Sequence, residues 1–232
     1  MNYTILEEEK TSTSGLTKLM GRVYGWMGAA LLISAVSSLL FLSSETATQL
    51  ILGSRFGFYG LIILEFLLVI GISGAINRIN SGTATALFIL YAILNGITLS
   101  PILLIYTGAS VAATFFITAA TFGVMSIAGY VTKKDLSTMG SYLIMGLIGV
   151  IIASVVNMFL HSETIDYIIS YLGVFIFIGL TAYDTQKIKT LGQEAINNGA
   201  SMQKIAILGA LTLYLDFVNL FLYLLRLFGR RK

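Results

Sequence analysis

The chain has 232 residues, of which 56% are hydrophobic and only 11% are charged, and its mean hydropathy of +0.89 lies far above that of soluble domains. The formal net charge is +3, and the absence of cysteine excludes disulfides, thiolate metal sites and thiol catalysis. The composition therefore predicts an integral membrane protein.

Apolar runs of about 20 residues, each long enough to cross a hydrocarbon layer of about 30 Å as a helix, recur along the whole sequence. The alternating pattern of a transmembrane β-barrel does not occur, so the predicted fold class is an all-α, polytopic membrane bundle. In chain order, we expect seven spans near residues 21–42, 56–76, 84–106, 109–131, 140–160, 165–185 and 203–228. A polar cytoplasmic N-terminus over 1–20 and a basic tail over 229–232 are expected to flank this transmembrane domain.

The distribution of lysine and arginine predicts the orientation of the spans, because cytoplasmic loops are enriched in positive charge. With the N-terminus inside, the outer loops contain one basic residue, Arg55. The C-terminal tail, which would also lie outside, carries further basic residues. The inner segments then hold Lys10, Lys18, Arg22, Arg78, Lys133, Lys134, Lys187, Lys189 and Lys204. The loops favour a cytoplasmic N-terminus and an outer C-terminus. The basic tail opposes this, and the alternative is a re-entrant last segment that returns the tail to the cytoplasm.

Three acidic residues, Glu65, Asp184 and Asp216, lie within or at the end of apolar runs. A carboxylate at the centre of a membrane helix costs about 2.5 kcal/mol or more to insert, and such residues generally mark an ion path or a proton relay. Glu65 either lines a cation path or is a protonated glutamate bonded to a neighbouring helix. Asn219 and Tyr223 share a helix face with Asp216, and this polar stripe could equally be a hydrogen-bonded clasp between helices.

Asp184 looks shallower than Asp216, but the first helix-stopping signal beyond it is the NNGA that ends at Ala200, so the sixth span should continue as a helix. Asp184 lies sixteen residues before Ala200 and Asp216 sixteen after it, which places both at the same height in a helical hairpin. Two carboxylates in one low-dielectric site cannot both ionise cheaply, so such a pair senses pH. Two cations would stabilise the ionised carboxylates and so oppose the sharing of a proton. Lys187 lies one turn beyond Asp184, and Arg78 lies at the inner end of the second span.

The stretches GLTAYDTQKIK and LYLDFVNLFLYLLRLFG, together with NGITLSPI at 95–102, resemble the Bax inhibitor (transmembrane Bax inhibitor motif) family, in particular its bacterial branch. The similarity runs through all seven spans. It implies a seven-helix bundle with the last helix at its centre, which leaks calcium down its gradient in a pH-dependent manner. It also implies that Asp184 and Asp216 form a di-aspartyl sensor with transient calcium contact, and that Arg78 is a latch to Asp184. The sequence around Arg78, NRINSG, has one arginine where some members have a basic cluster.

Two other functions stay open beside the calcium leak. One is a non-conducting regulator that binds other membrane proteins, such as a membrane protease. The other is an intramembrane aspartyl protease, for which Tyr183 and Asp184 fit one motif, but LYL precedes Asp216 where a Gly-x-Gly-Asp motif is needed. We therefore predict no catalytic residues, no resident cofactor and no nucleic-acid partner. The expected partners are the lipid bilayer, calcium as the transported ion, protons and, in the regulator alternative, other membrane proteins. The expected location is the bacterial inner membrane, and the sequence leaves the oligomeric state open, with a monomer as one alternative.

Overall fold

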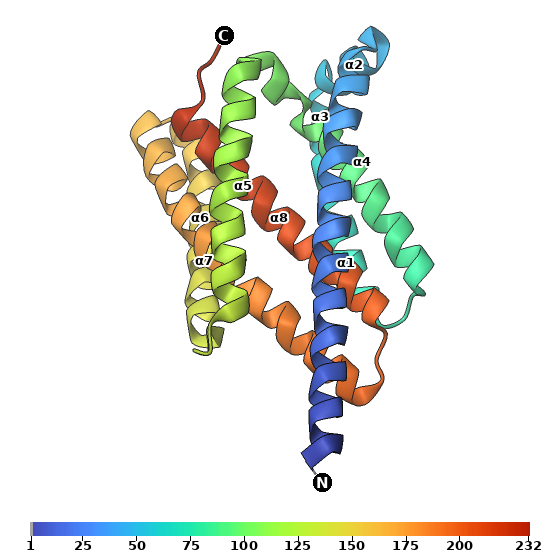
Figure 1. Ribbon diagram of the computed structural model, residues 1–232. Helices are drawn as coiled ribbons and strands as arrows, with labels where there is room; N and C mark the ends of the chain where they lie inside the picture. Colours follow the sequence, from blue (N-terminus) through green and yellow to red (C-terminus); the bar gives the residue numbers. More distant parts are fainter. Residues whose placement is uncertain (1) are drawn as a thin grey trace. The chain divides into compact units, whose positions relative to one another are not determined.

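The computed structural model describes residues 2–232, with side chains for residues 14–54 and 56–232. Met1 lies outside the described residues. So do the side chains of Lys10 and Arg55, two of the basic residues that predict the orientation of the spans. The described residues form eight α-helices (Figure 1). These are α1 (Asn2–Leu42), α2 (Glu45–Leu52), α3 (Arg55–Ala75), α4 (Ser81–Ile105), α5 (Gly108–Val131), α6 (Ser137–Leu160), α7 (Glu163–Asn198) and α8 (Met202–Phe228).

All helices except α2 are long and apolar enough to cross a membrane, which confirms the predicted all-α fold with seven spans. Two elements differ from the expectation. Helix α1 begins at Asn2 rather than near residue 21, because the polar segment before the span contains leucine, glutamate and lysine and no proline. Helix α2 lies in the predicted loop between the first two spans, and the Ser44 hydroxyl caps it by accepting a hydrogen bond from the Ala47 amide.

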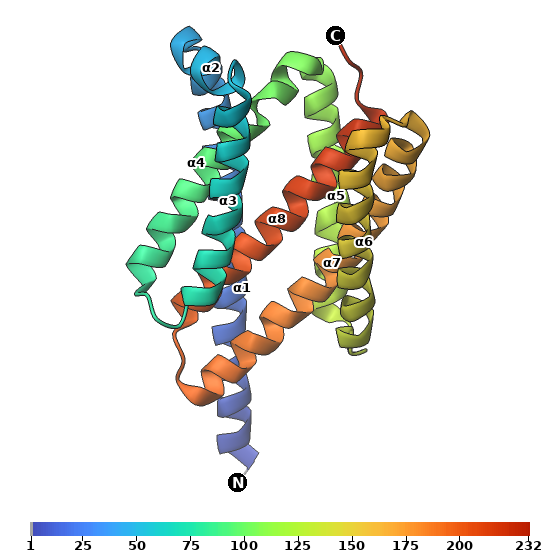
Figure 2. The same ribbon diagram turned by 180° about the vertical axis from the view of Figure 1, so that it is seen from behind.

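The predicted continuation of the sixth span is confirmed, since α7 extends to Asn198, well past the apolar limit near residue 185. Gly199 follows with a φ of 66°, a left-handed conformation that glycine adopts without steric cost. Helix α8 then runs unbroken to its end (Figure 2). The tail after α8 pairs with the connection between α4 and α5, where the Thr107 amide donates to the Arg230 carbonyl at 3.0 Å. The last segment is thus one continuous helix that is long and apolar enough to cross a membrane.

The helices form two compact units. The first unit comprises the residues up to Leu104 and residues 191–214, and the second comprises residues 105–190 and 215–232. Helices α7 and α8 contribute residues to both units. As the predicted central position requires, α8 is the most buried span: 61% of its apolar window is buried, against 11–44% in the other six.

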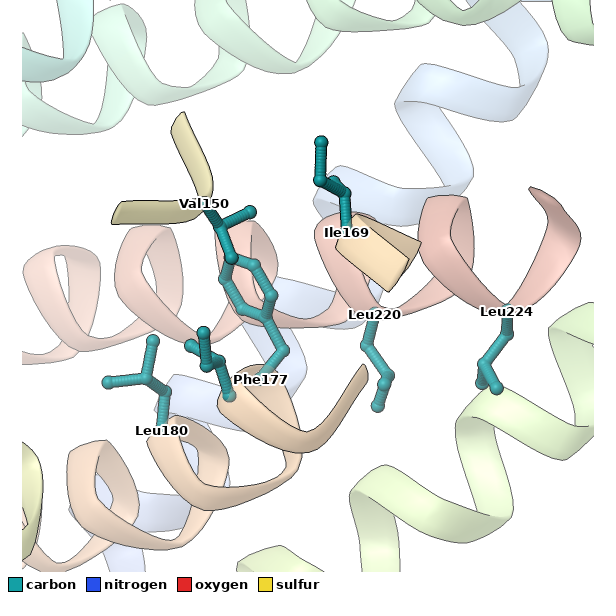
Figure 3. Packing of buried hydrophobic residues seen from close by; sticks show 7 residues of the cluster. Val150, Ile169, Phe177, Leu180, Leu220 and Leu224 are labelled. Atoms are coloured by element: carbon teal, nitrogen blue, oxygen red, sulfur yellow. The ribbon is translucent and has the colours of Figure 1, made fainter. Parts of the chain in front are cut away.

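The core of the second unit is an apolar cluster from α6, α7 and α8 (Figure 3). Its buried members are Val150, Ile169, Ile176, Phe177, Leu180, Leu220 and Leu224. The Tyr223 ring stacks on Phe177 with 5.9 Å between ring centroids. The same ring fills the space above Gly173, where an added Cβ would lie 2.6 Å from ring atoms. Tyr223 is therefore part of the packing between α7 and α8.

Candidate functional site: a carboxyl pair on α7 and α8

The carboxyl groups of Asp184 of α7 and Asp216 of α8 lie close enough to interact with each other in the second unit. Asp216 is 4% exposed, and Asp184 is partly exposed. The second oxygen of Asp216, Oδ2, is buried and has no hydrogen-bond partner among the described residues. Two carboxyl groups at close range in a buried site can share one proton, which would join them by a hydrogen bond.

Close packing on both sides of Asp184 fixes the backbone that carries it. Gly129 of α5 lies against the backbone of Ala182, where a Cβ would be 2.1 Å from the Ala182 carbonyl oxygen. Gly140 of α6 lies against the Tyr183 ring, where a Cβ would be 2.5 Å from ring atoms. The residues directly before Asp184 can occupy this position only because both facing residues are glycines. Packing against two neighbouring helices therefore fixes the backbone directly before Asp184.

The segment after Asp184 is held by hydrogen bonds to the connection between α5 and α6. The Gln186 side chain accepts from the Leu136 amide at 2.8 Å and donates to the Lys134 carbonyl at 2.9 Å. The Lys189 ammonium donates to the Tyr130 carbonyl at 2.8 Å and lies 4.9 Å from the centre of the Tyr130 ring. Gln186 was not predicted, because its partners Leu136 and Lys134 lie 50 and 52 residues away in the sequence.

Asp135 lies in the same connection, outside the membrane-spanning helices, and the pH dependence of its contacts can be tested. Hydrogen bonds from the Ser137 side chain and amide, the latter at 2.8 Å, hold the pKa of Asp135 below its usual range. A carboxyl group whose pKa falls on folding stabilises the fold above its usual pKa, and this contribution is lost as the pH falls through the folded value. We expect the amides that begin α6 to lose hydrogen-exchange protection below about pH 4. The Asp135→Ala variant should show that weaker protection at neutral pH as well; unchanged protection there would contradict the assignment.

The other residues predicted near the pair occupy different environments. Lys187 lies close enough to Asp184 for their charges to interact, and its ammonium group is 5.7 Å from the centre of the Tyr183 ring. The Asn219 amide group donates to the Leu215 carbonyl of its own helix at 2.8 Å, so this bond does not clasp a neighbouring helix. Arg78 is exposed in the turn after α3 and belongs to the first unit, whereas the pair belongs to the second. Its role as a latch stays a prediction.

Glu65 of α3 belongs to a buried hydrogen-bond chain in the first unit. The Asn95 amide group donates to Glu65 Oε2 at 2.9 Å, and the Thr98 hydroxyl donates to Glu65 Oε1. The Tyr214 hydroxyl donates to Asn95 Oδ1 at 2.8 Å and lies 2.7 Å from the Ser34 hydroxyl. The chain therefore joins α3, α4, α8 and α1. Of these residues the sequence predicted Glu65 alone, although Asn95 and Tyr214 are also polar groups within apolar runs.

The described residues contain no group of three or more histidine, cysteine, aspartate or glutamate side chains that could hold a metal ion. Calcium takes six to eight oxygen ligands, and the pair of Asp184 and Asp216 supplies two carboxyl groups. The pair by itself therefore supplies fewer ligands than a resident calcium ion takes.

The sequence matches a family model described as inhibitor of apoptosis-promoting Bax1, over residues 16–232. The inner membrane protein YbhL of Escherichia coli is 48% identical over 220 residues, which cover 94% of each chain. An uncharacterised protein of Borreliella burgdorferi is 48% identical over 98% of each chain. An uncharacterised protein of Rickettsia prowazekii is 45% identical over 99% of this chain and 96% of the relative.

Proposed function

The chain belongs to the Bax inhibitor family, and we propose that it is a pH-sensitive calcium leak gated by the carboxyl pair of Asp184 and Asp216. It is an integral, multi-pass inner-membrane protein, as its apolar helices and its relatives show. The observation that supports the proposal best is the interaction between the two carboxyl groups on α7 and α8, with the buried Oδ2 of Asp216 left without a partner among the described residues.

The pair links a proton to the contact between α7 and α8. While the two carboxyl groups share a proton, a hydrogen bond joins α7 to α8 in a low-dielectric environment. When the proton is lost, two negative charges repel each other at short range, which disfavours the joined arrangement. An ionised Asp184 is also the group that an arginine latch such as Arg78 would bind. Protonation therefore shifts the equilibrium between two conformations, of which one passes calcium.

Calcium flux into liposomes that contain the purified protein tests this mechanism. Asp184→Asn and Asp216→Asn preserve side-chain size but cannot lose a proton in this range. We expect the wild-type flux to change several-fold between about pH 6 and pH 8, and the flux of each variant to be independent of pH. Asp166→Asn is the matched control, because Asp166 also lies on α7 but is 43% exposed and paired with Arg226.

Wild-type pH dependence in both pair variants would exclude the mechanism. Absence of flux from the wild-type protein, together with a membrane protein that co-purifies with it, would favour the non-conducting regulator instead.

A further inference from the structure

A cavity of about 480 Å³ lies in the first unit, where the ends of α3 and α7 meet the start of α8. The connection between α7 and α8 lies beside the end of α3 there (Figure 2). A volume of several hundred Å³ is typical of sites that bind small molecules or lipid headgroups. The carboxyl pair belongs to the second unit, so this cavity is a separate feature.

The lining of the cavity is amphiphilic. Ile76, Leu191 and Leu208 contribute apolar side chains, while Asn77 and Ser201 contribute polar ones. The apolar span of α3 ends one residue before Ile76, and α8 begins one residue after Ser201. The cavity therefore lies at the height where membrane spans end, which is the height of lipid headgroups.

Two opposite charges line the same cavity without forming an ion pair with each other. Lys204 contributes an ammonium group, which donates to the Asn77 carbonyl at 3.4 Å, and Glu194 contributes a carboxylate. Among the described residues, the one ion pair within 4.0 Å joins Arg226 and Asp166 in the second unit. A ligand that carries one negative and one positive group complements this arrangement, whereas an anion alone would also face the carboxylate of Glu194.

We propose that the cavity binds the headgroup of a zwitterionic phospholipid with a primary ammonium group, a phosphatidylethanolamine. The phosphate is bound by Lys204, the ammonium group by Glu194, and the acyl chains lie along the apolar side formed by Ile76 and Leu208. A primary ammonium group has three N–H donors for a carboxylate. The quaternary ammonium group of phosphatidylcholine has none, so the two lipids should bind with different affinities. The proposal does not depend on calcium passage.

Native mass spectrometry of the purified full chain, titrated with dioleoyl lipids of different headgroups, tests this site. We expect phosphatidylethanolamine to bind at least about fivefold more tightly than phosphatidylcholine or phosphatidylglycerol. Glu194→Gln should abolish the preference over phosphatidylcholine, and Lys204→Gln should weaken binding of all three lipids. Glu163→Gln and Lys133→Gln are matched controls, because both residues are exposed and belong to the second unit.

A further variant, Ala200→Trp, keeps the charges of Lys204 and Glu194. Ala200 is exposed in the connection between α7 and α8 and lines the cavity, so the tryptophan side chain should fill it. It should weaken phosphatidylethanolamine binding while the thermal midpoint and the elution volume stay those of the wild type. Equal binding of the ethanolamine and choline lipids by the wild type would overturn the proposal. So would tighter binding of phosphatidylglycerol, or lipid binding by the Glu194, Lys204 and Ala200 variants that equals that of the controls.

Discussion

Gly129→Ala is expected to destabilise the protein by more than about 3 kcal/mol, although it adds a single methyl group. The new Cβ would lie 2.1 Å from the carbonyl oxygen of Ala182 and 2.8 Å from its carbonyl carbon and Cα. These are backbone atoms of α7, so the clash cannot be relieved by the rotation of a side chain. Helix α5 has to move away from α7, which breaks the close contact between the two helices.

Gly123→Ala is the matched control, because Gly123 lies on the same helix and an added Cβ there meets nothing within 4 Å. Alanine is favoured over glycine in a helix by up to about 1 kcal/mol, so this variant should be neutral or stabilised. Thermal unfolding of both variants in detergent, followed by circular dichroism, measures the difference. Equal midpoints for the two variants would show that α5 and α7 are not in close backbone contact.

The contact at Gly129 also bears on the site, because Ala182 is two residues from Asp184. If some Gly129→Ala protein folds, α7 no longer packs closely on α5 at that level. We then expect its calcium flux to lose the pH dependence of the wild type, as in the Asp184→Asn variant. The Gly123→Ala control should keep that dependence.

The spans could be predicted from the sequence because length and hydropathy set the minimum requirement for crossing a bilayer. The end of α7 could be predicted because NNGA places a glycine, Gly199, where the chain leaves the helix in a left-handed conformation. Helix α2 was missed because eight residues of mixed polarity carry too weak a periodicity to distinguish a short helix from a loop. The division into two units was also not visible, since it depends on which helices pack together.

The candidate site could be predicted in part. Counting residues to Ala200 placed Asp184 and Asp216 at one height, but their contact depends on the rotation of each helix about its axis, which the count does not determine. Tyr223 was assigned to a polar stripe, yet its ring is mostly apolar and packs on Phe177. Glu65 was identified by its charge alone. Its partners come from helices distant in the sequence, which a pattern within one helix cannot reveal.

Glu65→Leu is expected to destabilise the protein by about 2 to 4 kcal/mol, because it leaves one buried and one half-buried hydrogen-bond donor without their acceptor. These donors are the amide group of Asn95 and the hydroxyl group of Thr98. Glu65→Gln retains a carbonyl acceptor for Asn95 and should cost less than about 1 kcal/mol. Tyr214→Phe keeps the ring packing on Phe88 but removes the hydroxyl group that donates to Asn95.

Thermal midpoints and calcium flux of these variants distinguish the two interpretations of Glu65. If the glutamate serves as a hydrogen-bond acceptor between helices, Glu65→Gln keeps both stability and flux, and Glu65→Leu loses stability. The double variant Glu65→Leu/Tyr214→Phe should then lose less than the sum of the single variants, because both act through Asn95. If Glu65 instead lines the ion path, Glu65→Gln keeps its stability but loses most of its calcium flux, because a neutral amide attracts a divalent cation far less than a carboxylate does.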